Sequence, residues 1–186
     1  MMIRARTILA LAAAAAVAAA VLGGAFVYSG IYDVSAKREH TAPVYFLVHA
    51  AMVRAVQVRA ASIQVPPLSD PAMRRCGEIL FTQHCVQCHG GPGVAPREFA
   101  LGLRPEATNL AAVGRDWTPA EIYWVIDNGI KMTAMPAWER HLSPHEMWSI
   151  TAFVKQLPEI SPADFRKAAQ TASLTAAPPP CIAGGG

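Results

Sequence analysis

The sequence predicts an all-α protein, because helix signals recur along its length. Residues 8–28 form a long run without a charged side chain. Residues 44–58 repeat apolar side chains at three- and four-residue steps, as one face of a helix requires. Thr118-Pro-Ala-Glu121 and Ser143-Pro-His-Glu146 are capping boxes with proline at the first helical position, so a helix is expected to begin at each.

Changes in composition divide the chain into four predicted segments, and the first change is the turn to polar residues after Tyr32. Pro66-Pro67 ends the second of them, and the sequence after Ser161-Pro162 is rich in alanine, threonine and proline. The segments are an N-terminal signal-anchor or transmembrane helix at 1–30, a linker with an amphipathic helix at 31–69, a helical domain at 70–160 and a disordered tail at 161–186.

The uncharged run at 8–28 follows Arg4 and Arg6. As a helix it would be roughly 31 Å long, about the thickness of a bilayer core. We predict a single-pass transmembrane anchor whose basic end stays in the cytoplasm. A cleaved signal peptide is the alternative, because Ala18-Ala19-Ala20 offers a small-residue cleavage site. In both cases the rest of the chain is exported.

The linker is expected to contain a helix that begins at Thr41, with Pro43 in its first turn. The predicted apolar face of this helix consists of Val44, Leu47, Val48, Ala51, Ala55 and Val58. Arg54 and Arg59 favour contact with anionic lipid headgroups. The alternative is a helix that packs on the following domain or on a partner protein.

The charge distribution argues against a nucleic-acid-binding protein. The formal net charge is +3 over 186 residues. Residues 37–60 carry four basic side chains against one acidic side chain, whereas residues 70–160 carry 8 basic and 10 acidic side chains. This distribution lacks the basic stripe that binds a phosphate backbone.

Cys85-Val-Gln-Cys88-His89 is the attachment motif of c-type haem. Two thiols three positions apart can form thioethers to the two vinyl groups of one porphyrin, and the histidine that follows becomes the proximal iron ligand. A thioredoxin-like site would need βαβ surroundings and a structural zinc site a second ligand pair, and the sequence offers neither. Cys76 and Cys181 remain, and the sequence leaves open whether they pair.

The sixth iron ligand is sought among the downstream side chains Met132, Met135, His141, His145 and Met147. Met135 is the predicted ligand, because it lies in the irregular stretch between two capped helices and Pro136 stiffens the chain after it. Met132 is the alternative. Met147 falls within the last helix and is expected in the core.

Thioether ligation predicts electron transfer rather than catalysis. Methionine is a soft, neutral ligand that favours ferrous iron and raises the potential above that of bis-histidine ligation. An iron closed by His89 and Met135 has no open position for oxygen or peroxide. We therefore expect no catalytic residue and no small-molecule substrate.

The first and last helices of the domain are expected to pack together. Asp70 is the predicted N-cap of the first helix. Gly77 and Phe81 share one face of that helix, where a glycine lets another helix cross closely. The expected contact from the last helix is Phe153 or Ile150.

Together with the stretch Asn128-Gly-Ile-Lys-Met-Thr-Ala-Met135-Pro-Ala-Trp138, the haem motif resembles the class I c-type cytochromes. More narrowly, the chain is similar to the small membrane-anchored monohaem cytochromes of proteobacteria, over residues 70–160. The resemblance implies a class I cytochrome c fold around one covalent haem c. It implies thioethers at Cys85 and Cys88 and iron ligation by His89 and Met135.

The resemblance also implies partners for the haem and its proximal ligand. A proline carbonyl is expected to accept the second N–H of His89, and the candidates are Pro92, Pro96 and Pro105. The haem propionates are expected near Trp138, together with Arg97, Arg104 or Lys131. Ordinary packing is the alternative role of Trp138.

The predicted protein is an electron carrier rather than an enzyme, tethered to the bacterial inner membrane with its haem domain in the periplasm. Its expected partners are redox proteins, namely a membrane dehydrogenase, a quinol-oxidising complex or a terminal oxidase. A permanent haem c subunit of a dehydrogenase or oxidase complex is the alternative. A haem enzyme or gas sensor with a displaceable sixth ligand is a third hypothesis.

Overall fold

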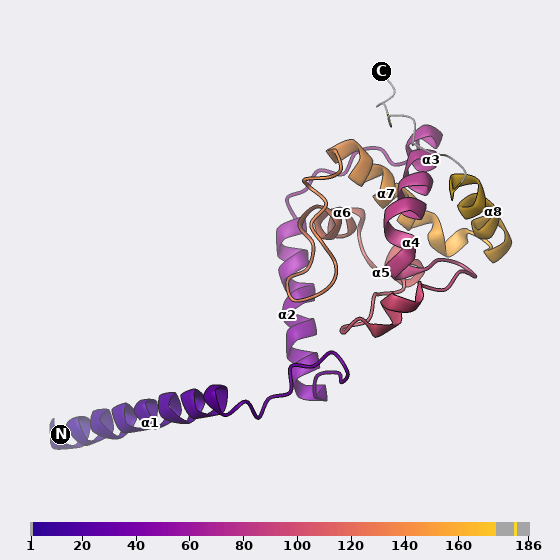
Figure 1. The fold of residues 1–186 in the computed structure, drawn as a ribbon. Coiled ribbons are helices and arrows are strands. Elements are labelled where there is room, and N and C mark those ends of the chain that lie inside the picture. The colour runs from indigo at the N-terminus through magenta and orange to yellow at the C-terminus, as the bar shows by residue number, and fades with distance from the viewer. Residues whose placement is uncertain (1, 174–180, 182–186) are drawn as a thin grey trace. The chain divides into compact units, whose positions relative to one another are not determined.

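The computed structural model describes residues 2–173 and residue 181, and all the regular elements in that part of the chain are helices (Figure 1). One isolated bridge joins Gly91 to Val94. The prediction of an all-α protein is confirmed. The chain forms two compact units, Met1–Ser35 and Ala36–Gly186.

The first unit consists of helix α1, Met2–Ser29, and the residues that follow it. Residues 4–29 are long and apolar enough to cross a membrane, by length and composition. The helix ends at Gly30, whose φ of +64° suits a glycine. Beyond it, the ring of Tyr32 lies 6.5 Å from the ring of Phe26.

The second unit contains seven α-helices and three short helical turns among its described residues. They are α2 (Ala42–Ala60), α3 (Pro71–Leu80), the π-helix η1 (Phe81–Cys85), α4 (Val86–His89), the 3-10 helix η2 (Glu98–Gly102), α5 (Leu110–Asp116), α6 (Pro119–Asn128), α7 (Pro144–Gln156), the 3-10 helix η3 (Leu157–Glu159) and α8 (Pro162–Ser173).

Helices α3 and α7 form the centre of this unit, as the sequence predicts. Gly77 of α3 faces the backbone of Ser149 in α7, and the rings of Phe81 and Phe153 lie 5.3 Å apart in a tilted arrangement. The buried core around them consists of Cys76, Leu80, Phe81, Ile122, Ile126, Leu142, Met147, Ile150, Phe153, Val154, Leu157 and Phe165. Met147 therefore belongs to the core, as expected.

The predicted helix caps are present, with one exception. Asp70 Oδ1 accepts a hydrogen bond from Ala72 N at 2.8 Å and caps α3. Thr118 and Ser143 each form the full capping box with the glutamate three residues later. Helix α2 does begin after Thr41, but the Thr41 side chain makes no capping hydrogen bond. Of the two sequence signals for the start of α2, the structure therefore supports Pro43 in the first turn but not a side-chain cap by Thr41.

The predicted apolar face of α2 is wrong. The buried residues of α2 are Val56 and Ala60, and it is against α6 that this helix packs. Leu47, Val48 and Val58 are exposed instead. Because the first half of α2 carries apolar side chains at successive positions, Val44 to Val48, the three- and four-residue spacing could not identify the face that packs.

The predicted disordered tail is wrong for residues 162–173, which form α8. Phe165 of this helix is 1% exposed and lies in the core, with its ring 6.1 Å from that of Phe81. Cys181 forms a disulfide with Cys76 of α3, which answers the open question about these two cysteines. The helical unit therefore extends beyond residue 160; the remaining tail residues lie outside the described part of the chain.

Candidate functional site

One continuous helical segment carries the whole cysteine–histidine motif. Helix α3 passes into the wider turn of η1, where Val86 N donates to Phe81 O, and then into α4. Cys85 is the N-cap of α4, and Cys88 and His89 lie within it. Single π-type turns are frequent at functional sites because they reorient the side chains that follow. The structure therefore places both thiols and the imidazole within about one helical turn.

The two motif cysteines are half-buried, and each is a free thiol. Cys85 packs against the core. Burial, and to a lesser extent the proximity of Cys88, raises the pKa of the Cys85 thiol to about 12. This thiol is therefore neutral at physiological pH in the folded chain.

The imidazole of His89 is fixed by the backbone of Thr108. Its Nδ1 lies 2.8 Å from the Thr108 carbonyl oxygen. Because that oxygen can only accept, Nδ1 carries the proton and Nε2 presents its lone pair. Burial lowers the pKa of His89, and the hydrogen bond to Thr108 opposes this shift less strongly. The ring is thus held neutral, which is the state that ligates iron.

The predicted proline acceptor for His89 is wrong, because Thr108 fills that position. Every residue type has a backbone carbonyl, so the sequence could not show which residue accepts this hydrogen bond. Asn109 is the available signal: its Oδ1 accepts from Ala111 N at 2.9 Å and from Ala112 N at 3.4 Å. This N-cap fixes the start of α5 and with it the preceding peptide.

The glycine turn after His89 packs against the residues that follow it and against α8. Gly90 has a φ of +62°, and a Cβ there would lie 2.6 Å from Val94 O. A Cβ on Gly91 would collide with the ring of Phe165. Helix α8 thus supports the turn that follows the motif, a contact that no local sequence pattern signals.

Met135 and Met132 occupy very different environments in the loop between α6 and α7. Met135 is half-buried and packs against the core. Met132 is 91% exposed, at a φ of +61°. Of these two methionines, Met135 is the one that packs against the apolar core.

Two hydrogen bonds hold the backbone around Met135. Ile130 N donates to Met135 O at 3.1 Å, and Met135 N donates to Thr133 Oγ1 at 3.1 Å. Gly129 allows the loop to close, since it has a φ of +66° and its Cβ would lie 2.7 Å from the carbonyl carbon of Pro136. The loop is irregular but well fixed.

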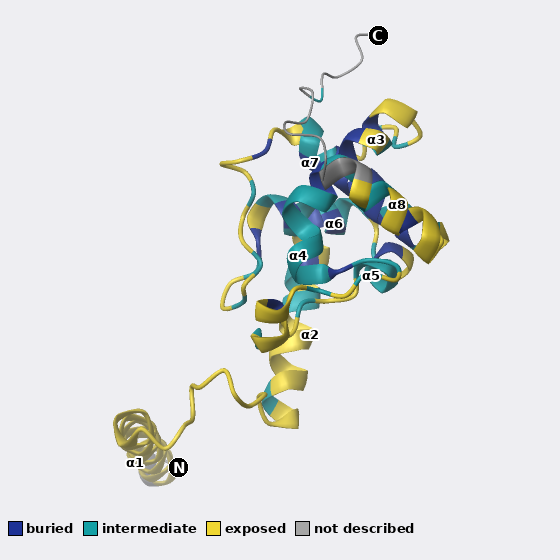
Figure 2. Ribbon diagram, turned by 45° about the vertical axis from the view of Figure 1, so that its right-hand side comes forward, coloured by how far each residue is buried: buried dark blue, intermediate teal, exposed yellow. Residues whose placement is uncertain are grey.

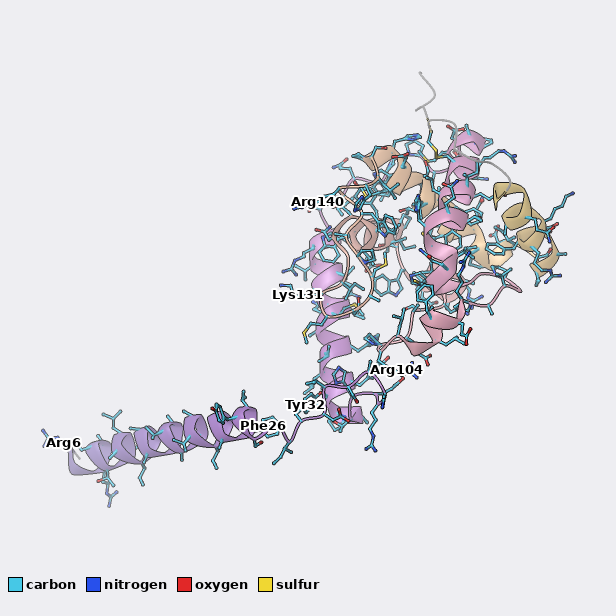
Figure 3. All side chains as sticks on the ribbon, viewed as in Figure 1. Arg6, Phe26, Tyr32, Arg104, Lys131 and Arg140 are labelled. Atoms are coloured by element: carbon cyan, nitrogen blue, oxygen red, sulfur yellow. A yellow bond between two sulfur atoms is a disulfide. The ribbon has the colours of Figure 1, made fainter. Side chains whose placement is uncertain are left out.

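Of the cations predicted to hold the propionates, Arg104 lies near two glutamates, whereas Arg97 is exposed. Arg104 Nε lies 3.7 Å from Glu39 Oε1, and Arg104 Nη1 lies 3.5 Å from Glu106 Oε1. Lys131 is exposed; Figure 3 labels Arg104 and Lys131. Trp138 packs against the core, with its ring 5.2 Å from that of His84, so ordinary packing already accounts for much of its position.

This set of residues fits a covalently attached haem. It provides the free thiols of Cys85 and Cys88 and a neutral His89 imidazole whose Nδ1 is hydrogen-bonded. It also provides the soft thioether of Met135, a residue that packs against the core. Within residues 2–173 and 181, His, Cys, Asp and Glu side chains form no group of three or more that could hold a metal ion by themselves. The alternative of a structural zinc site thus finds no ligand set in this part of the chain.

Residues 72–154 match the family profile described as cytochrome c oxidase, cbb3-type, subunit III. The matched span runs from α3 almost to the end of α7, so it contains the motif, Thr108 and Met135. The searches of curated proteins and of solved structures returned no match. Helices α1, α2 and α8 lie outside the matched span.

Proposed function

Because residues 72–154 match the profile of a c-type cytochrome family, we propose that this chain binds one haem c and passes single electrons between redox proteins. A bound haem c supplies a reversible one-electron iron couple. In the proposal Cys85 and Cys88 form the thioethers, His89 binds the iron through Nε2, and Met135 closes the sixth position.

The observation that carries the proposal is the hydrogen bond from His89 Nδ1 to Thr108 O, 2.8 Å long. A metal-binding histidine nearly always donates its second N–H to such an acceptor, which fixes the tautomer and raises the basicity of the ligating nitrogen. Here that arrangement occurs on a histidine that directly follows two free thiols. A histidine that merely packed on the surface would not need it.

Met135 as sixth ligand is supported by its burial and by the closed loop that carries it. A methionine whose backbone N–H and carbonyl are both hydrogen-bonded loses little freedom on binding, so its weak thioether can compete with water. Closure of the sixth position favours outer-sphere electron transfer over reaction with oxygen.

The experiment compares Met135→Ala with Met132→Ala in the haem-loaded full chain. We expect Met135→Ala to lose the long-wavelength charge-transfer band of methionine-ligated ferric haem and to gain rapid binding of carbon monoxide. Met132→Ala should retain the parent spectrum, because its side chain is 91% exposed. Loss of the band in the Met132 variant alone would overturn the assignment, and rapid carbon monoxide binding by the parent would favour the gas-sensor hypothesis.

The proposed location is the inner membrane, with α1 as the anchor and the haem domain in the periplasm. The support is the apolar helix at 4–29, which is long enough to span a bilayer and has arginines at its start. Intact mass determines whether α1 is retained, and protease added to spheroplasts should digest the second unit without lysis. Protection from protease until lysis would contradict the periplasmic placement.

A second candidate is a permanent subunit of a terminal oxidase, favoured by the description of the matched family. The two candidates share their haem chemistry and differ in the lifetime of the partner complex. Native electrophoresis after mild detergent extraction distinguishes them. A stable stoichiometric complex would exclude the free carrier, whereas migration as a lone chain would exclude the permanent subunit.

A further inference from the structure

The first half of α2 presents an apolar surface that no described residue of the second unit covers. All residues from Tyr45 to Ala51 are exposed, and Phe46 and Leu47 are 70% and 66% exposed. Val44 before this stretch and Met52 after it are half-buried, and full burial within α2 is reached at Val56 and Ala60. Figure 2 shows this division, with one end of α2 exposed and projecting beyond the other helices of its unit.

The composition of this exposed half is unlike that of a solvated helix. No charged side chain occurs from Thr41 to Val53, a stretch of 13 residues. As a helix it is about 20 Å long, too short to span a bilayer. Uncharged stretches of this length are typically core helices or segments that lie at a membrane interface. The exposure of Tyr45–Ala51 excludes a core helix for this stretch.

The connection to α1 keeps this segment close to the membrane that α1 would span. Twelve residues, 30–41, separate the two helices, and even fully extended they reach only about 42 Å. They include the exposed apolar side chains of Ile31 and Val34 and the cations Lys37 and Arg38. Tyrosines and basic side chains beside an apolar stretch are typical of the headgroup region of anionic membranes.

We propose that Ala42–Ala51, the apolar half of α2, lies in the headgroup region of the membrane that anchors α1. The lipid surface covers Tyr45, Phe46, Leu47 and Val48, while the second half of α2 packs on α6. Helix α2 then fixes the orientation of the haem domain above the bilayer. This inference rests on the anchoring by α1 in the proposed function, but not on the ligation of the iron.

The cysteine chemistry of the chain makes a direct test possible. With haem attached at Cys85 and Cys88 and with Cys76 bonded to Cys181, the protein has no other cysteine. A single Phe46→Cys substitution therefore introduces a unique thiol for a nitroxide spin label. The matched control is Phe99→Cys, on η2, where the parent side chain is 58% exposed and equally aromatic.

The full haem-loaded chain is reconstituted into phosphatidylethanolamine–phosphatidylglycerol vesicles, and its intact mass confirms that α1 is retained. Collision of each label with oxygen, which concentrates in lipid, is compared with collision with a water-soluble nickel complex. We expect the oxygen-to-nickel ratio to be several-fold higher at position 46 than at position 99. Replacement of Lys37 and Arg38 by glutamine should lower the ratio at position 46.

Two results would overturn the inference. Equal ratios at positions 46 and 99 would place the apolar half of α2 in water. Shielding of position 46 from both reagents would indicate a protein surface instead, either a partner or a second copy of the chain. The visible spectrum of the same samples reports haem attachment and ligation independently, so neither result would be confused with failure of the proposed electron-transfer function.

Discussion

Gly77 of α3 lies directly against the backbone carbonyl of Ser149 in α7. A Cβ at position 77 would collide with that carbonyl oxygen and would lie 3.0 Å from the Cβ of Phe153. Ser149 is itself fully buried. The crossing of the two central helices therefore depends on the absence of a side chain at position 77.

Gly77→Ala should destabilise the protein by about 1–3 kcal/mol, the usual cost of overpacking a core. The new Cβ would collide with the backbone carbonyl oxygen of Ser149, which cannot move aside as the end of a side chain can. Chemical denaturation of the haem-loaded chain measures the loss. Gly102→Ala is the control, since a Cβ at Gly102 meets nothing within 4 Å. Equal stability of the two variants would show that α3 and α7 cross less closely than described.

Asn109→Ala should weaken the hydrogen bond between Thr108 and His89. Loss of the α5 cap should cost about 1 kcal/mol and loosen the peptide that carries the Thr108 carbonyl. A less basic His89 favours ferrous iron, so the midpoint potential should rise. Redox titration measures this shift, and Asn109→Asp, which retains a capping oxygen, should stay near the parent value. A lowered potential in Asn109→Ala would contradict the assigned role of the Thr108 carbonyl.

Replacement of Cys76 and Cys181 together by serine should lower the free energy of unfolding by about 2–4 kcal/mol, because the disulfide closes a long loop in the unfolded chain. The two cysteines are 105 residues apart in sequence. Thermal unfolding of parent and variant, with and without reductant, provides the measurement. Reductant should destabilise the parent to the level of the variant and leave the variant unchanged; sensitivity of the variant would indicate another reducible bond.

Acidification should destabilise the protein in part through His84. Burial lowers the pKa of His84 from its ordinary value of 6.5, with His141 acting in the same direction and Glu146 in the opposite one. The unfolded chain therefore binds this proton more readily, so its contribution to stability is complete above about pH 6.5 and is lost as the pH falls toward the folded value. His84→Gln should flatten the stability profile below that pH. A variant profile parallel to that of the parent would contradict this expectation.

Local chemistry in the sequence was sufficient for most of the domain. The caps at Asp70, Thr118 and Ser143 and the close approach at Gly77 were predicted because each depends on a residue type with one local role. The Thr108 carbonyl that accepts from His89 was not predicted, since any residue can supply a carbonyl. Helix α8 was missed because its alanine-rich composition resembles a flexible tail. Its start is nevertheless capped locally, since Asp164 N donates to Ser161 Oγ, and the ring of Phe165 packs against those of Phe81 and Phe153.

The C-terminal disulfide places opposing demands on the maturation of the chain. Cys76 and Cys181 must be oxidised to tie the end of the chain to α3, whereas the proposed haem attachment requires Cys85 and Cys88 to remain thiols until it occurs. Four cysteines allow three ways to form two disulfides, and all three consume the attachment thiols. Productive assembly therefore requires that haem attachment be faster than oxidation at Cys85 and Cys88, or that a reductant act on those two cysteines alone. The yield of mature protein should thus depend on the order of two chemical events in one compartment.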